Sequence, residues 1–324
     1  MADILSERGL VLASGHPGNG AAEVQPELYP FSEHGGRRID ERKHALQPYI
    51  MPPSEFQRFS ESTRQTLVDW MVQRHLILEN DDDTEMLHLA LRYVDTFLAL
   101  RGTESFLSEG AAGSAGSAGA DSYSGSPPCN KLKRLGITCL FIAAKMTVCQ
   151  PYSTPLEFVL YSQVKSFTRR QLFLAEKSLL RVLEYYLYPP TPSSFSGAYL
   201  SVTMRCLPET LVSVRPEAFD DPADEIKHIV DYLLEVSVLA QRSLEFAPSL
   251  LAAAAIWYTL SSVYCVPWDQ LRPLHAMTGY SQAALRQCSF FLDKVVADAH
   301  VTSLQNAGQT WVNVKYQRAT GILF

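Results

Sequence analysis

The stretch that decides the fold is LKRLGITCLFIAAKMTVC, residues Leu132–Cys149. After two basic residues it is apolar almost without interruption over Leu135–Ala144, where Gly136 and Ala143 let neighbouring helices approach closely. A helix that is apolar on every side is predicted to lie in the middle of a core, wrapped by other helices. Lys145 follows at its far end, and because an unpaired ammonium is costly to bury, it must reach water or an acceptor.

The composition is that of a globular protein with room for two ordinary domains: 324 residues, 47% hydrophobic and 19% charged. A net charge of −6 provides no bulk attraction to nucleic acid or acidic membranes. The six cysteines lack CxxC spacing, and the histidines form no HExxH, so we expect free buried thiols, no metal and no cofactor. The start of the chain lacks the basic region of a signal peptide. Ser249–Val266 is uncharged and about as long as a membrane span, but its alanines and hydroxyl side chains favour a second buried core helix.

We expect the N-terminal third to begin with a flexible segment, 1–28, and a helical segment, 29–53. Helices follow over Ser62–Glu79 and Glu85–Leu100, each with an apolar stripe at helical spacing. Residues 102–128 are rich in Gly, Ser and Ala, and we expect a disordered insertion there, because such residues cannot bury a core.

After the central helix the pattern remains helical, and no strand-like alternation of any length occurs. Helices are expected at Leu156–Gln163, Thr168–Leu183, Ser193–Met204, Asp224–Ala240, Ala247–Val263, Trp268–Met277 and Ser281–Ala297. The proline-rich joint Tyr188–Pro192 separates two groups of helices. We therefore predict an all-α fold with a first domain at 54–188, a second at 189–300 and a C-terminal tail at 301–324.

A weak internal repeat relates the two domains. At an offset of 113 residues (285 − 172), apolar positions of the first domain meet small or apolar positions of the second; the pairs are Leu172 and Leu285, Leu179 and Leu292, Val182 and Val295, Gly136 and Ser249, and Ala143 and Ile256. The simplest interpretation is two tandem five-helix domains of one plan, each built around an apolar central helix.

Two charged residues stand out in the first domain. Lys145 ends the central helix, and Glu176 falls on the apolar stripe of a later helix. Alone, Lys145 could favour the C-terminal end of its helix dipole, and Glu176 could be the solvated edge of its helix. At the repeat offset they become Tyr258 and Ser289, so a need common to both domains does not explain them. Together they favour a binding site for a partner.

These residues resemble a cyclin. The segments TRQTLVDWM (Thr63–Met71), MLHLALRYVDTFL (Met86–Leu98), KLKRLGITCLFIAAK (Lys131–Lys145), EFVLYS (Glu157–Ser162) and QLFLAEKSLLRVLEYYLYPPTP (Gln171–Pro192) arrive in the order of a cyclin box. FAPSLLAAAAIWYTL in the C-terminal half looks like the second cyclin fold. The sequence LVDWM and the Pro48-Tyr49 pair are most similar to the A/B, mitotic, group.

The resemblance implies a regulatory subunit that binds and activates a cyclin-dependent serine/threonine protein kinase in mitosis, in nucleus and cytoplasm. In this family a lysine and a glutamate at the positions of Lys145 and Glu176 make the central kinase contact. The family surface also matches Met146, Tyr185, Leu187, Tyr29 and Tyr49. Such a subunit selects the active kinase conformation by docking and needs no catalytic groups of its own. Consistent with this, the chain carries no GxGxxG, P-loop or GxSxG motif, and we do not expect an enzyme.

The first helix departs from the family. By resemblance, a substrate-docking patch there would comprise Thr63, Gln65, Thr66, Leu67, Trp70 and Lys133, yet three of these replace apolar or small residues and Lys133 replaces an amide. A patch this polar should hold a leucine poorly. Arg64 and Asp95 match a buried structural ion pair. The alternative function is a kinase-independent scaffold or transcription adaptor, but the sequence shows no clustered Lys/Arg stripe, and we expect neither nucleic acid nor membrane as a partner.

Overall fold

The computed structural model describes residues 61–78, 84–108, 130–147, 154–205, 207, 212–214, 216–305 and 310–317. All of them belong to one compact unit, His34–Phe324. Within these ranges every regular element is helical, which confirms the all-α prediction. The expected flexible segment 1–28 and helical segment 29–53, with Tyr29 and Tyr49, lie outside the described residues.

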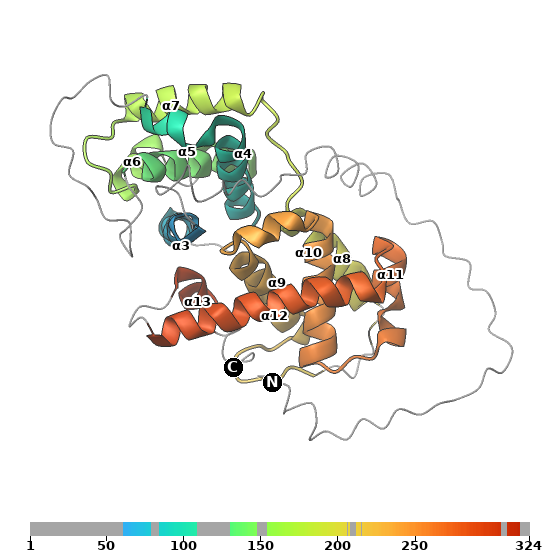
Figure 1. Ribbon diagram of the computed structural model, residues 1–324. Helices are drawn as coiled ribbons and strands as arrows, with labels where there is room; N and C mark the ends of the chain where they lie inside the picture. Colours follow the sequence, from blue (N-terminus) through green and yellow to red (C-terminus); the bar gives the residue numbers. More distant parts are fainter. Residues whose placement is uncertain are drawn as a thin grey trace, which may run out of the picture. The chain divides into compact units, whose positions relative to one another are not determined.

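The first domain is built around the predicted central helix. It comprises α3 (Glu61–Leu78), α4 (Thr84–Ser108), α5 (Asn130–Thr147), α6 (Pro155–Tyr161) and α7 (Arg169–Val182), and α5 contacts the other four (Figure 1). Every residue of α5 from Leu135 to Ala144 is buried, as expected of a helix that is apolar all round.

Side-chain caps set where α6 and α7 begin. The side chains of Thr154 and Thr168 each accept a hydrogen bond from the backbone N–H three residues later. In turn, side-chain oxygens of Glu157 and Gln171 accept a hydrogen bond from the backbone N–H of the cap residue. These capping boxes satisfy amide groups that have no partner inside the helix. The predicted cap of the second of these helices by Thr168 is confirmed.

The second domain repeats this plan. It comprises α8 (Pro192–Met204), α9 (Pro222–Ser237), η2 (Gln241–Glu245), α10 (Pro248–Tyr258), η3 (Thr259–Val263), η4 (Trp268–Leu271), α11 (Arg272–Thr278) and α12 (Gln282–Gln305), and α10 contacts α8, α9, α11 and α12. The residues paired by the repeat share their burial: Leu172 with Leu285, Leu179 with Leu292, Val182 with Val295, and Ala143 with Ile256 are all buried. The uncharged stretch after Ser249 is therefore a core helix, as predicted. No helix in the described part of the chain combines the length and apolar character that crossing a membrane requires.

Two helices extend beyond the ends that the sequence pattern predicted. The helix expected to end at Leu100 continues to Ser108, so the disordered insertion cannot begin at residue 102. Gly102 lowers helix stability by only about 1 kcal/mol, and the six residues after it contain no proline, so the established helix can propagate through them. The helix expected over Ser281–Ala297 likewise continues to Gln305 as α12, and the predicted tail at 301–324 contains a further helix, α13 (Trp311–Lys315). The sequence pattern did not predict α13, because a helix of 5 residues has too few turns to show a clear periodicity of apolar residues.

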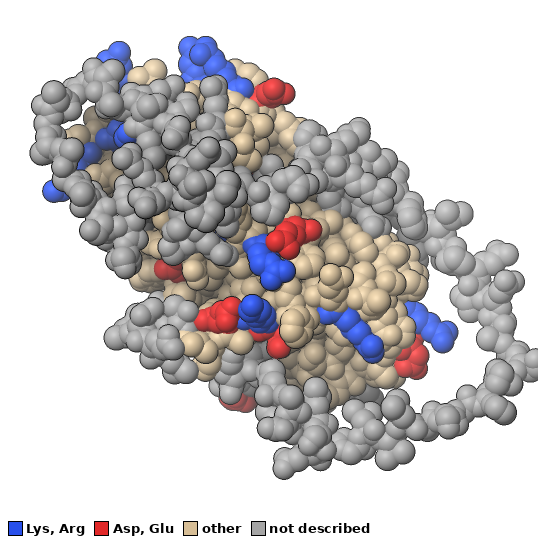
Figure 2. All heavy atoms as spheres, viewed as in Figure 1, with Lys and Arg blue, Asp and Glu red and all other residues tan. Residues whose placement is uncertain are grey.

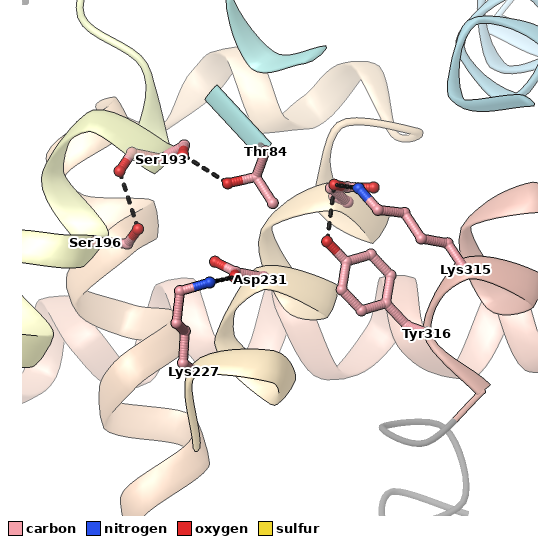
Figure 3. Close-up of polar contacts among 8 residues, drawn as sticks. Thr84, Ser193, Ser196, Lys227, Asp231, Lys315 and Tyr316 are labelled. Carbon is pink, nitrogen blue, oxygen red and sulfur yellow. Dashed lines mark hydrogen bonds and ion pairs between the residues drawn. The ribbon is translucent and has the colours of Figure 1, made fainter. Parts of the chain in front are cut away.

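Helix α13 connects the two domains, because it contacts both α3 and α9. The backbone N–H of Trp311 donates to Oδ1 of Asp69 at 2.7 Å. The side chains of Lys315 and Tyr316 point toward one acceptor, the fully buried Glu235, with the Tyr316 hydroxyl donating at 2.8 Å (Figure 3). Burial raises the pKa of Glu235, and these two donors oppose that rise.

A second connection runs through Arg64. Its Nε and Nη2 donate to the two oxygens of Asp95, each at 2.9 Å, so the ion pair predicted between the first two helices is present. Its Nη1 also donates to the carbonyl oxygen of Val238 at 2.6 Å, a contact with the second domain that the sequence did not reveal. Thr84 of α4 and Ser193 of α8 add a hydroxyl–hydroxyl bond of 2.8 Å (Figure 3).

Candidate partner-binding surface

Lys145 reaches an acceptor within the chain. It follows the buried Ala143 and Ala144 in the last turn of α5, and its ammonium forms an ion pair with the Glu176 carboxylate of α7. Its Nζ also lies 4.3 Å from the ring centroid of Phe141, a distance at which the ring face attracts a cation. The two charged residues that stood out in the sequence are therefore neighbours in space.

The pair lies at the edge of the core, not inside it. The Lys145 side chain is 39% exposed and that of Glu176 15%, so both heads can still be reached by a partner. A half-exposed ion pair of this kind contributes at most about 1 kcal/mol to stability. The two remaining ammonium protons of Lys145 and the second carboxylate oxygen of Glu176 can donate to and accept from a partner's backbone.

The second domain shows what the fold itself requires at these positions. Tyr258 and Ser289 occupy them, and both are buried. The Tyr258 hydroxyl donates to Oδ1 of Asp293 at 3.1 Å, a single hydrogen bond in place of an exposed ion pair. The five-helix plan can therefore be built without the exposed pair.

Aromatic rings lie next to the pair. Phe141 packs edge-on against Phe158 with ring centroids 5.2 Å apart and lies 6.1 Å from Phe173. The Phe173 side chain is 39% exposed, although it stands beside the core residue Leu172 in the sequence. The sequence analysis did not identify Phe173. The feature that could have identified it is an aromatic residue that lies outside the apolar stripe formed by Leu172, Ala175 and Leu179.

The segment after α7 is held in an unusual conformation. Glu184 and Tyr185 have φ angles of 51° and 58°, in the left-handed region that side chains with a Cβ rarely adopt. The N–H of Tyr185 donates to the carbonyl of Leu180 at 3.0 Å, which holds the turn against the helix end. Tyr185 itself is 64% exposed. Residues at such angles cost about 1–3 kcal/mol each and persist only where surrounding contacts fix them.

Two tyrosines anchor the segment that leads away from this turn. The Tyr93 hydroxyl donates to the carbonyl oxygen of Leu187 at 2.6 Å, and burial raises the pKa of Tyr93. The Tyr188 hydroxyl donates to the carbonyl of Met146 at 3.2 Å, next to Lys145. Met146 and Leu187 are half-buried against the core. Of the predicted kinase-contact residues, Lys145 and Met146 therefore end α5 and Glu176 lies midway along α7 against Lys145. Tyr185 and Leu187 follow α7, and the bond from Tyr188 brings this segment to Met146.

The predicted docking patch on α3 is largely closed. Leu67 is fully buried, and Thr63 and Trp70 are 8% and 7% exposed. Gln65, Thr66 and Lys133 are half-buried at its rim. Lys133 Nζ lies 6.0 Å from the Trp70 ring centroid, and the Arg74 guanidinium lies 5.6 Å from it. Two cations beside the tryptophan would repel a basic-x-leucine segment, so weak docking at this patch remains our prediction.

The chemistry available at the Lys145–Glu176 surface is that of binding. It offers an exposed ion pair, two partly exposed rings and a fixed turn. Among the described residues, no group of three or more His, Cys, Asp or Glu side chains is placed to hold a metal ion.

Comparison with known proteins matches both domains. The cyclin N-terminal domain model matches residues 37–188, and the cyclin C-terminal domain model matches residues 190–320. Cyclin-B1-3 of Arabidopsis thaliana is 24% identical over 286 residues, 88% of this chain and 56% of that protein. The G2/mitotic-specific cyclin S13-7 of Glycine max is 25% identical over 72% of this chain and 73% of its own length. The chain spans about half the length of the first curated relatives, 56% and 42%.

A solved structure supports the same fold. A viral cyclin from herpesvirus saimiri aligns with a TM-score of 0.54 at 15% sequence identity, covering 81% of this chain and 96% of that one.

Proposed function

Because the chain belongs to the cyclin family, we propose that it binds and activates a cyclin-dependent serine/threonine protein kinase and so controls mitotic progression. The mitotic assignment is supported by the B-type and G2/mitotic-specific relatives. On this proposal the chain is a regulatory subunit without catalytic groups of its own, and it works in the nucleus and the cytoplasm.

The observation that carries the proposal is the Lys145–Glu176 ion pair on one of two equivalent domains. The first domain leaves this pair partly exposed near Phe173, whereas the second domain buries a neutral tyrosine and a serine at the equivalent positions. A partly exposed ion pair next to an exposed aromatic side chain has the composition of an interface core, in which aromatic anchors accompany a few directed hydrogen bonds.

The mechanism follows from rigidity. A protein kinase is active when the glutamate of its αC helix pairs with the lysine of its third strand and its activation loop is ordered. A surface formed by a fully packed helix end and a fixed turn binds one kinase conformation better than the other, and that difference in affinity shifts the kinase toward the active state. Little binding energy is lost to ordering this surface, because its backbone is already held by Tyr93 and Tyr188.

The test is recovery of kinase activity with the tagged chain from dividing cells, using histone as substrate. Lys145→Ala/Glu176→Ala is expected to reduce recovered activity at least about tenfold, a loss of about 1.4 kcal/mol or more in binding. The matched control is Arg242→Ala/Glu245→Ala, which removes an exposed ion pair of the second domain with N–O distance 3.6 Å. The free energy of unfolding of both variants should lie within about 1 kcal/mol of the wild-type value.

Three results are informative. Activity lost with the first variant and kept with the control supports both the function and the surface. Activity kept with both variants shows that the kinase binds elsewhere. A wild-type chain that recovers no kinase at any stage of the cycle contradicts the proposal and favours a kinase-independent scaffold.

A further inference from the structure

The outer face of α7 carries a basic hollow that shares Phe173 with the proposed kinase surface and otherwise lies outside it. Arg169, Arg170, Phe173, Leu174 and Lys177 line a shallow, open hollow of about 490 Å³. We propose that this hollow is a docking site for an acidic protein segment whose apolar side chain packs on Leu174 and Phe173 while its carboxylates contact the surrounding cations.

Helix register explains why these five residues share a face. Positions 169, 173 and 177 are spaced by four, and 170 and 174 lie one step round the helix, so all five project together. Leu172 and Leu179 project to the other side and are buried in the core. Leu174 is 58% exposed and Phe173 39% exposed. A single exposed leucine is ordinary, but an exposed leucine and phenylalanine at the floor of a cation-lined hollow form an anchor point.

Among the described residues, no ion pair joins Arg169, Arg170 or Lys177 to a carboxylate. Glu176 is the acidic residue of α7, and it pairs with Lys145 at the domain edge, away from Arg170 and Lys177. Arg181 is also exposed one helical turn after Lys177 and extends the row of cations. In Figure 2, Lys and Arg side chains stand along the edge formed by α7, where acidic side chains are few. The chain as a whole carries −6, so this face attracts anionic partners locally against the overall charge.

The hollow combines cations with apolar side chains, and this combination indicates which kind of partner fits it. A nucleic acid duplex is held by a stripe of about six to ten phosphate contacts, whereas this face has few cations and places apolar side chains between them. An acidic peptide with one apolar residue satisfies both features. The sequence suggested no basic cluster, because these cations are spread over nine positions and become neighbours only on the helix.

Phe173 also relates this face to the proposed kinase surface. Its ring contacts Phe141 beside Lys145, and the guanidinium of Arg169 lies 5.5 Å from its centroid. A segment docked in the hollow would therefore lie next to a bound kinase, which is where a substrate or regulator of that kinase is useful. Binding to the hollow itself needs no kinase, so the two proposals can fail separately.

The test uses the purified full chain and a fluorescein-labelled peptide in which glutamates flank one leucine, followed by fluorescence anisotropy. Wild type should bind saturably and lose at least about tenfold in affinity between about 50 and about 200 mM salt, as charge-driven binding requires. Arg170→Glu/Lys177→Glu should weaken binding at least about tenfold. Leu174→Ser, or a peptide with serine in place of leucine, should weaken it about threefold to tenfold.

The repeat supplies a matched control. Arg286 and Lys294 are exposed on α12, at the positions equivalent to Phe173 and Arg181. Arg286→Glu/Lys294→Glu changes the net charge by the same amount as the α7 double variant and should leave peptide affinity within about twofold, since exposed charges farther apart than about 10 Å are screened.

Several results would overturn the proposal: no saturable binding by wild type, an equal loss with the α12 control, or equal affinity for the leucine-free peptide. Equal binding of a DNA duplex would assign the face to nucleic acid instead. Kinase recovery unchanged in the α7 double variant supports a separate docking site, whereas loss of kinase and peptide together would place the hollow inside the kinase interface.

Discussion

Replacing Arg64 with methionine should be the most damaging single substitution at the contact between the two domains. Its side chain is 1% exposed; it pairs through two nitrogens with Asp95 and donates a third bond to the carbonyl of Val238. Methionine fills a similar volume, so the cost is electrostatic and not a cavity. The buried Asp95 carboxylate would lose its main counter-charge, which costs about 3–5 kcal/mol, and the carbonyl would lose a donor, which adds about 1 kcal/mol or more.

The measurement is equilibrium unfolding in urea, followed by circular dichroism. Arg64→Met should lower the free energy of unfolding by about 4–6 kcal/mol, a large share of the about 5–15 kcal/mol typical of a folded protein. Adding Asp95→Asn removes the unpaired charge, so Arg64→Met/Asp95→Asn should be more stable than the sum of the single changes predicts by about 1.5 kcal/mol or more. Arg242→Met, at an exposed pair of the second domain, should cost less than about 0.5 kcal/mol.

Two outcomes would refute this reasoning. A loss below about 1 kcal/mol for Arg64→Met would mean that Asp95 finds solvent or another donor in the variant. Additive losses in the double variant would mean that the ion pair does not couple the two residues.

Three further predictions concern separate positions. Burial raises the pKa of Asp69 from 3.8 to about 6, opposed by the N–H of Trp311, so the folded state binds more protons than the unfolded state between those pH values. The free energy of unfolding of the wild type should therefore fall by up to about 3 kcal/mol as the pH rises from about 4 to 6. Urea titrations at several pH values should show that Asp69→Asn abolishes this dependence. A Cβ on Gly136 would lie 3.1 Å from Met71 Cγ and Sδ, so Gly136→Val should lower the urea midpoint by an amount equivalent to about 1–3 kcal/mol, and an unchanged midpoint would show that Met71 yields freely. Tyr185 holds φ at 58°, so Tyr185→Gly should raise thermal stability by about 1 kcal/mol while reducing kinase recovery, and a destabilised variant would show that the turn is not strained.

The parts of the fold that sequence could predict depend on local pattern. The burial of α5 followed from its apolar run, and the start of α7 followed from Thr168, because capping uses residues only three apart. The equivalence of the domains followed from a constant offset between apolar positions. For the candidate site, the same reasoning identified Lys145 and Glu176 as exceptions to the pattern, although not as partners of one another.

The features that sequence could not predict depend on contacts between distant residues. The bond from Arg64 to Val238 and the docking of α13 on Asp69 join positions separated by 174 and 242 residues, and no periodicity encodes them. The basic face of α7 was missed for another reason. Its cations are ordinary when counted along the chain, and they form a surface only after the helix is known to turn its other side to the core.

The repeat provides an internal comparison that separates folding from function. Positions at which the two domains agree, such as Leu179 and Leu292, are buried and maintain the core. The exposed face of the fifth helix differs, since Lys177 of α7 corresponds to Phe290 of α12, which is 73% exposed. Because one packing plan tolerates both surfaces, packing does not determine which residues stand there. Under our two proposals, the ion pair at the end of α5 and the cations of α7 are determined by what the first domain binds.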